Sequence, residues 1–402
     1  MLKKLPVAQL QTGMYVHALC GTWLSHDFWR TSFLINSTEI LHKLQTSAVQ
    51  EVWIDTARGT PMKAAAQAYT LNTFTNDTTP TSLGKEIRRA AAICEQSRDA
   101  VMHMFREARM GNALDTQAAS RLVSAICSSV KRHPDALITV ARLKTSDNYT
   151  YMHSVAVCGL MMALAKKLGW QDAQTLQAGM AGLLHDMGKA RSKPEILNKP
   201  GALTETEFNH MKLHPEQGYA MLKDSLQDTD VLDACLHHHE RMDGKGYPHG
   251  LHSAQIPQLT RMTTICDVYD AITSDRPYKQ GWSPSVALQR MSQWCHTHLD
   301  AKIFEVFVQT IGLYPVGSLV RLQSGLLAVV CAPAQSSMST PQVTAFYDIR
   351  LKRMLQPAKL LDLAQLPNES IVAAEDPSQW GFKDLESLWK KALHSPSAQT
   401  TP

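Results

Sequence analysis

The chain has 402 residues, of which 44% are hydrophobic and 19% charged, and its formal net charge is +4 at pH 7. This composition is typical of a globular protein of two or three domains, and the small net charge argues against a nucleic-acid polymer as partner. No apolar run reaches the roughly 18 residues of a membrane span, and the N-terminus lacks a signal-peptide pattern, so we expect a cytoplasmic protein with no membrane segment.

Residues 1–56 predict a small mixed α/β module. The segments LPVAQL and MYVHAL alternate as strands do, ILHKLQ has helical spacing, and VQEVWIDT again has the character of a strand. Residues 57–82 are rich in polar and small residues with no consistent period, which predicts a linker.

Residues 83–312 predict helices almost throughout. Residues 83–132 form a helical connector of two helices joined at Gly111 and Asn112. In residues 133–312 we expect a helical bundle, whose boundaries are marked by a capping box at Thr204 and Glu207, by Pro215 and Pro284 at helix starts, and by Gly169 and Gly312 at helix ends.

Residues 313–402 predict a short β-rich extension. VGSLVRLQSGLLAVVCA has the pattern of a hairpin around a Ser-Gly turn, and VTAFYDI predicts one more strand, before a disordered end at SPSAQTTP. The predicted fold class is therefore mainly α, with a small mixed α/β module before the helical bundle and a β-rich extension after it.

Seven potential metal ligands lie in the helical part of the chain: His153, His185, Asp186, His214, His238, His239 and Asp267. One histidine alone is more often an ordinary core or surface residue than a ligand. Here, however, the acidic groups lie in the apolar helical segments AGMAGLLHDMGK and MTTICDVYDAIT, where a buried carboxylate needs a cationic partner. Since one ion uses about three or four protein ligands, seven ligands predict two ions that share ligands.

His185 and Asp186 are expected near the end of a helix, from which both side chains reach one cavity. Lys189 follows His185 by four residues, a spacing that places both on one helical face. Asp186 is the best candidate for a bridging carboxylate, because it can offer one oxygen to each ion. Two ions about 3.5 to 4 Å apart would bridge a hydroxide that attacks a phosphodiester, assisted by Lys189, so we assign catalytic roles to Asp186 and Lys189.

Three further predicted helices carry other ligands. His153 begins a helix whose apolar residues mark one buried side, His238 and His239 end another helix, and Asp267 lies inside a third. Helices of a bundle can direct ligands from several segments into one core. The sequence leaves open whether these ligands converge.

The motifs around these residues resemble the HD-GYP family, bacterial phosphodiesterases that hydrolyse cyclic di-GMP. The resemblance covers about residues 145–312 and lies in HDMGKARSKPEILNKPGALTETEFNHMKLHP, HHERMDGKGYPHGL and ICDVYDAITSDRPYK. It implies that the seven residues named above bind two divalent ions, that Lys189 is the catalytic lysine, and that Asp270, Arg276 and Lys279 contact the dinucleotide. Imidazole with carboxylate suits iron or manganese, our first choices, and also zinc.

Tyr149 departs from the pattern of some family members, which hold a third metal through a glutamate at this position. A tyrosine is a poor substitute ligand, so we expect two ions and linear pGpG as the main product, with further cleavage to GMP left open. Tyr149 could instead pack or hydrogen-bond near the substrate.

Gly246, Tyr247 and Pro248 contain no metal ligand and predict a loop with an exposed aromatic ring. In related proteins this loop is associated with binding diguanylate cyclases of the GGDEF type, so cyclase binding is a hypothesis here. The N-terminal segment also resembles a small domain of unknown function that often precedes HD-GYP. Its role in sensing, dimerisation or scaffolding stays open, and a homodimer is a further hypothesis.

The leading hypothesis is a phosphodiesterase for cyclic di-GMP. One alternative is the same chemistry on another cyclic or linear dinucleotide. Another is a non-catalytic module that recruits a cyclase through the GYP loop. The complete ligand set with Lys189 argues against this last alternative, because a scaffold has no physical need for it.

Overall fold

The computed structural model describes residues 2–7, 10, 12–19, 32–46, 51–55, 77–141, 149–197, 199, 201–275, 281–334, 337–382, 385 and 387–389. Internal contacts divide the chain into two units, residues 1–73 and 74–402. Within the described residues, no helix combines the length and apolar character needed to cross a membrane. The domain boundaries given above stay predictions.

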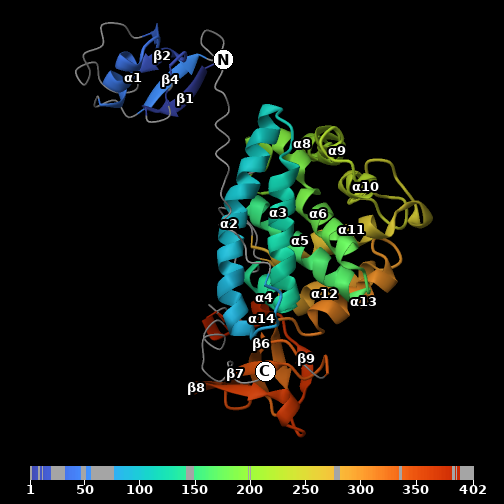
Figure 1. The fold of residues 1–402 in the computed structure, drawn as a ribbon. Coiled ribbons are helices and arrows are strands. Elements are labelled where there is room, and N and C mark those ends of the chain that lie inside the picture. The colour runs from blue at the N-terminus through green and yellow to red at the C-terminus, as the bar shows by residue number, and fades with distance from the viewer. Residues whose placement is uncertain are drawn as a thin grey trace. The chain divides into compact units, whose positions relative to one another are not determined.

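The first unit contains a four-stranded antiparallel sheet and one helix (Figure 1). In the order β1-β4-β2-β3, the strands are β1 (Leu2–Pro6), β4 (Glu51–Asp55), β2 (Tyr15–Leu19) and β3 (Phe33–Leu34), and the helix is α1 (Thr38–Gln45). Val16, Leu44 and Val52 are buried in a core of this unit's own. The mixed α/β prediction is confirmed, but the first strand lies earlier than LPVAQL and ends at Pro6, which lacks the N–H that would continue a ladder.

Helices α2 (Leu83–Met110) and α3 (Thr116–Arg132) are the two helices predicted for residues 83–132. α2 ends where Gly111 adopts a left-handed conformation with φ 81°. A buried ion pair joins the helices, because Arg132 donates from Nε and Nη2 to the two carboxylate oxygens of Glu86 at 2.7 and 2.9 Å. Removal of one partner would leave a buried charge uncompensated, which costs about 3 to 5 kcal/mol.

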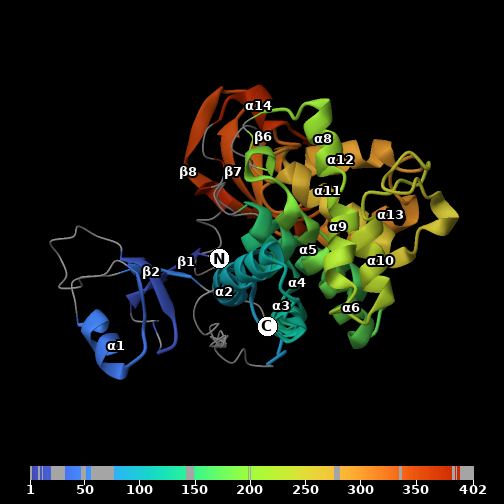
Figure 2. The same cartoon turned by 90° about the horizontal axis from the view of Figure 1, so that it is seen from above.

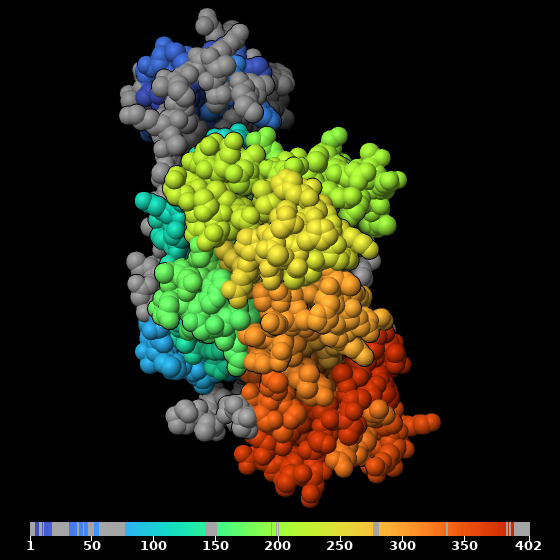
Figure 3. Space-filling model, turned by 90° about the vertical axis from the view of Figure 1, so that its right-hand side faces the viewer, coloured from blue at the N-terminus to red at the C-terminus, as the bar shows by residue number. Residues whose placement is uncertain are grey.

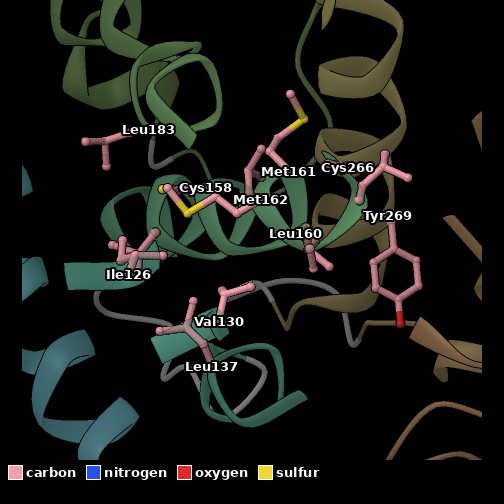
Figure 4. Packing of buried hydrophobic residues seen from close by; sticks show 14 of the residues in the cluster. Ile126, Val130, Leu137, Cys158, Leu160, Met161, Met162, Leu183, Cys266 and Tyr269 are labelled. Atoms are coloured by element: carbon pink, nitrogen blue, oxygen red, sulfur yellow. The ribbon is translucent and has the colours of Figure 1, made fainter. Parts of the chain in front are cut away.

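Helix α5 (Tyr149–Lys167) is the central helix of the second unit. Its neighbours are α2, α3, α4 (Pro134–Ala141), α6 (Asp172–Leu184), α11 (Gln258–Thr273) and α13 (Ala301–Ile311). Residues 152–165 are all buried, so the expectation of one buried side was wrong: α5 is apolar around its circumference because helices surround it. In Figure 4, Cys158, Leu160, Met161 and Met162 point away from α5 on different sides.

Further helical elements, of which α8, α9, α10 and α12 are labelled in Figure 2, complete the helical part of the second unit. They are η4 (Met187–Arg191), α7 (Pro194–Leu197), α8 (Glu205–Met211), α9 (His214–Leu222), α10 (Thr229–His237), η5 (Ser253–Gln255) and α12 (Pro284–Trp294). The predicted boundary signals are confirmed: the capping box begins α8, the two prolines lie in the first turns of α9 and α12, and glycines with positive φ follow α5 and α13.

A five-stranded antiparallel sheet follows the helices, in the order β8-β7-β6-β5-β9. Its strands are β5 (Leu319–Leu322), β6 (Leu326–Ala332), β7 (Gln342–Asp348), β8 (Arg353–Asp362) and β9 (Ile371–Ala374), with the short elements η6 (Leu363–Gln365) and α14 (Pro377–Trp380). Leu319 and Val329 join the helical core, whereas Val320 and Val330 form a separate cluster on the other face of the sheet.

The hairpin predicted in this extension is confirmed as β5 and β6, with Gly325 at φ 83° between them, and VTAFYDI contains most of β7. β8 and β9 were missed. β8 contains Pro357, which interrupts the strand pattern, and it lies at the sheet edge, where a residue without an N–H is tolerated. The end SPSAQTTP, predicted to be disordered, lies outside the described residues. The fold is mainly α, as predicted.

Candidate metal centre

A buried cluster of histidine and aspartate side chains lies among α5, α9, α11 and the ends of α6 and α10. The seven predicted ligands fall into two groups, and within each group the ligand atoms lie within 4.8 Å of one another. The groups are His153, His185 and Asp267, and Asp186, His214, His238 and His239. Of the seven, only His239 is not fully buried. The structure therefore brings together residues that are spread over more than a hundred positions of the sequence.

Asp186 lies between the two groups. Its Oδ2 is 3.5 Å from His153 Nε2 and 3.4 Å from His185 Nε2, while its Oδ1 is 3.3 Å from His214 Nε2 and 3.7 Å from His238 Nε2. Oδ1 is buried and makes no hydrogen bond with the part of the chain that the structure describes. A buried carboxylate oxygen without a partner is costly, and divalent cations on either side of the carboxylate would satisfy both oxygens. The residues present therefore fit divalent metal.

The end of α6 positions Asp186, as the sequence predicts. α6 ends at Leu184, and η4 follows from Met187. Lys189 therefore lies on η4 and not on the α-helical face expected for it, because the chain turns at Asp186, whose backbone has φ −98° and ψ 8°. The turn still places Lys189 Nζ 2.5 Å from Asp186 Oδ2.

Local backbone carbonyls orient three of the histidines. In each case Nδ1 donates a hydrogen bond to the carbonyl three residues earlier: His185 to Gly182 at 2.8 Å, His214 to Met211 at 2.7 Å, and His238 to Cys235 at 2.9 Å. Because a carbonyl oxygen can only accept, Nδ1 carries the proton in each ring. In the neutral ring the lone pair of Nε2 then faces the cluster, which is the form of imidazole that binds metal.

His153 has a different orienting partner. Its Nδ1 hydrogen-bonds with Asp270 Oδ2 at 2.6 Å, while its Nε2 lies 3.0 Å from Asp267 Oδ1. Asp270 follows Asp267 by three residues on α11, so both carboxylates lie on one face of that helix, and Asp270 is 4% exposed. The residue that the family resemblance assigns to the substrate thus contacts a predicted ligand.

The electrostatics of the cluster favour metal-binding forms of most of these groups. Burial would raise the pKa of Asp186, but Lys189 and His185 hold it well below its usual range. Burial lowers the pKa of His238 to about 4. Burial also acts to lower the pKa of His185, yet Asp186 and Asp267 raise it to about 10. At neutral pH Asp186 and Asp267 are therefore ionised and His238 is neutral, whereas the His185 ring carries a second proton.

The other predicted site residues have different outcomes. Tyr149 is the first residue of α5, but the position of its side chain lies outside the described part of the chain, as do Arg276 and Lys279 entirely. Tyr247 was expected to be exposed, and this was wrong. Its ring packs on His239 with ring centroids 4.8 Å apart and an interplanar angle of 31°, because the loop folds back onto the metal centre.

Sequence reasoning missed two buried residues, Thr264 and Glu240, that adjoin the predicted ligands His238 and His239. Thr264 donates to the carbonyl of His238 at 2.8 Å, and Glu240 is buried and accepts two backbone N–H groups. The position of Glu240 directly after two predicted ligands is a signal that could have found it.

Comparisons with known proteins identify the family. A family model described as an HD domain matches residues 122–303, and one described as a domain of unknown function (DUF3391) matches residues 2–119. A Pseudomonas aeruginosa protein named cyclic di-GMP phosphodiesterase PA4108 is 50% identical over 97% of this chain and 96% of its own length.

Two further relatives match the helical part. The cyclic di-GMP phosphodiesterase response regulator RpfG of Xanthomonas campestris is 37% identical over 42% of this chain and 45% of its own. The 3′3′-cGAMP-specific phosphodiesterase 1 of Vibrio cholerae is 33% identical over 44% of this chain and 42% of its own. With a near full-length match at 50% identity and the His/Asp cluster in place, the chain belongs to the HD-GYP family, with a DUF3391 domain before its HD domain.

Proposed function

We propose that this chain is a metal-dependent phosphodiesterase that hydrolyses cyclic di-GMP to linear pGpG. The observation that carries the proposal is the buried Asp186 carboxylate, whose two oxygens face two separate groups of histidines. The relative named as a cyclic di-GMP phosphodiesterase, which is 50% identical along almost the whole chain, supports the choice of substrate.

The two groups of side chains divide the predicted ligands between two ions. His153, His185 and Asp267 would hold one ion, and His214, His238 and His239 the other, with Asp186 shared. Nitrogen-rich donors with carboxylates suit iron and manganese, and zinc as well. Bound there, the ions would supply an activated water nucleophile and neutralise charge on the phosphate.

Lys189 is the proposed catalytic lysine. Its ammonium group is fixed by Asp186, and its side chain is 21% exposed, so a substrate can approach it from the solvent side. A point charge held beside the phosphodiester would stabilise the charge that develops on the phosphoryl oxygens, or donate a proton to the leaving oxygen. Asp186 thus has two roles, as ligand and as the residue that positions Lys189.

An assay of the purified chain tests this function. Protein loaded with iron, manganese or zinc is incubated with cyclic di-GMP, and the products are separated by chromatography. We expect pGpG as the main product, because Tyr149 replaces the glutamate that some relatives use for a third metal. Absence of turnover with all three metals would refute the proposal.

Metal binding should release at least one proton per chain at pH 7. The pKa of His185 is about 10, because Asp186 and Asp267 outweigh the effect of burial, so the ring must lose a proton before it can bind metal. His238, with a pKa of about 4, has no proton to lose at this pH. The apparent affinity should therefore rise by about tenfold or more per pH unit through the neutral range.

Calorimetric titration of manganese in buffers of different ionisation enthalpy measures the number of protons released. A count near zero, with affinity independent of pH, would contradict the assignment of His185 as a ligand.

Replacing Asp270 with asparagine separates two roles for this residue. Its contact with His153 supports a positioning role, and loss of such a partner typically lowers metal affinity about 10- to 100-fold. We expect this loss in Asp270→Asn, with an unchanged KM for cyclic di-GMP once the protein is saturated with metal. A raised KM at unchanged metal affinity would instead assign Asp270 to substrate binding. Asp99→Asn, a half-buried position on α2 outside the cluster, is the matched control.

A second candidate substrate is another cyclic dinucleotide, since the Vibrio cholerae relative is named as specific for 3′3′-cGAMP. Competition between the two cyclic dinucleotides in the chromatographic assay separates these candidates, and Arg276 and Lys279 are the residues that we propose to read the guanine edges and phosphates. Binding of GGDEF-type cyclases through the GYP loop, a homodimer and a cytoplasmic location stay predictions.

A further inference from the structure

The two residues that flank His238 and His239 both contact the loop that carries Gly246, Tyr247 and Pro248. Glu240 is 1% exposed. Its Oε1 accepts from the backbone N–H of His249 at 2.6 Å, and its Oε2 accepts from that of Leu251 at 3.0 Å. Hydrogen bonds to an ionised carboxylate are about twice as strong as neutral ones, so Glu240 anchors the far end of the loop.

His237 lies on the other side of the ligand pair and hydrogen-bonds with the ring of His249, the loop residue whose backbone N–H binds Glu240. His237 Nε2 hydrogen-bonds with His249 Nδ1 at 2.9 Å, and His237 Nδ1 donates to Asp233 Oδ1 at 2.8 Å. Thr260 Oγ1 donates to the second carboxylate oxygen of Asp233 at 2.7 Å. His249 is thus fixed both through its backbone, by Glu240, and through its ring, by His237.

The loop also packs closely on the ligand segment. A Cβ added to Gly246 would lie 2.5 Å from Glu240 Cα and from the backbone nitrogen of Arg241, so only glycine allows this approach. The next residue, Tyr247, donates its backbone N–H to the carbonyl of His239 at 3.3 Å and packs its ring against the His239 ring at an interplanar angle of 31°. In Figure 3 this part of the chain, in yellow, lies at the molecular surface.

The packing of Tyr247 covers the most accessible part of the candidate metal centre. His239 is the one ligand candidate of the seven that is not fully buried, with its side chain 24% exposed. Tyr247 lies against that ring. A displaced loop would leave His239 open to water and remove one wall from the site.

We propose that Glu240 is a positioning residue, which holds residues 246–251 so that Tyr247 covers His239 and forms a wall of the substrate site. The proposal rests on the proposed function, because the wall acts on the substrate of that site. Of the four consecutive residues His237, His238, His239 and Glu240, the inner two face the metal cluster and the outer two fix the loop that closes over it.

Glu240→Gln tests the role of the carboxylate at constant side-chain size. The amide replaces one acceptor by an NH₂ group that faces a backbone N–H, so the loop should loosen. We expect amide hydrogen exchange in residues 246–252 to accelerate about tenfold or more, while exchange elsewhere and the metal content per chain stay unchanged. The KM for cyclic di-GMP should rise about tenfold, with a smaller change in kcat.

Two further variants complete the test. Glu305→Gln, an exposed position on α13, should leave exchange and KM unchanged. Gly246→Ala displaces the loop without altering the Glu240 carboxylate. It should reproduce the faster exchange and the higher KM of Glu240→Gln. This variant tests the proposal independently if Glu240→Gln folds poorly.

Unchanged exchange in residues 246–252 would overturn the proposal, and so would an acceleration spread over the whole chain, which marks a general structural role. Hydrogen exchange needs no turnover, so it tests the role of Glu240 even where the wild-type chain fails to hydrolyse cyclic di-GMP. Such a failure would refute the proposed function but not the role of Glu240 in holding the loop.

Discussion

Asp186→Asn should abolish metal retention and reduce phosphodiesterase turnover by about a thousandfold or more. The substitution keeps the size of the side chain but replaces one anionic oxygen by an NH₂ group. Whichever way the amide is turned, one histidine group loses its carboxylate oxygen and faces a hydrogen-bond donor instead. The loss of negative charge also weakens attraction for any cation in a buried site, where water cannot compensate.

Elemental analysis of protein purified without air, together with the chromatographic assay, measures both effects. Asp224→Asn is the matched control, because Asp224 is exposed and lies outside the cluster. A variant at position 186 that keeps two ions per chain and full turnover would show that Asp186 is not a shared ligand.

Much of the candidate site could be predicted from the sequence because its chemistry is concentrated in adjacent residues. His185 with Asp186, and His238 with His239, are pairs of ligand types in apolar helical segments, and such pairs are visible without a structure. Helix ends were also predictable, since capping residues, prolines and glycines act locally. The orienting contacts of three histidines are local too, each reaching a carbonyl three residues earlier.

What could not be predicted depends on contacts between distant segments. The pairing of His153 with Asp270 spans 117 positions, and nothing near either residue in the sequence indicates it. The burial of α5 on all sides follows from the number of helices around it, not from its own periodicity. The turn residues around Tyr247 predict an exposed loop, whereas the fold lets Glu240, which comes shortly before the loop, hold it down through the backbone N–H of His249.

Two glycines allow close backbone approaches, of α6 to α5 and of η4 to α9. A Cβ on Gly182 would lie 2.9 Å from the backbone of Cys158, so α6 can approach α5 only because this residue is glycine. A Cβ on Gly188 would lie 1.8 Å from the carbonyl oxygen of His214. The glycine at this position therefore allows η4 to approach the start of α9. The two glycines therefore fix His185, Asp186 and Lys189 relative to the predicted ligands on neighbouring helices.

Lys189→Met should separate catalysis from metal binding. We expect kcat to fall about 100- to 10,000-fold, because the variant loses the ammonium group that acts on the phosphodiester, while its apolar chain fills a similar volume. Metal content should be kept or increased. The ammonium lies beside Asp186 and repels a cation there, so its removal favours metal binding.

The opposite pattern would contradict the catalytic role of this lysine. Loss of metal in parallel with loss of turnover would mean that Lys189 acts only by holding Asp186 in place. Lys193→Met, an exposed lysine two residues beyond η4, controls for the loss of a positive charge near the site and should change neither quantity. Since Asp186→Asn should lose metal and Lys189→Met should keep it, the two variants together assign metal binding to the carboxylate and the chemical step to the ammonium group that it holds.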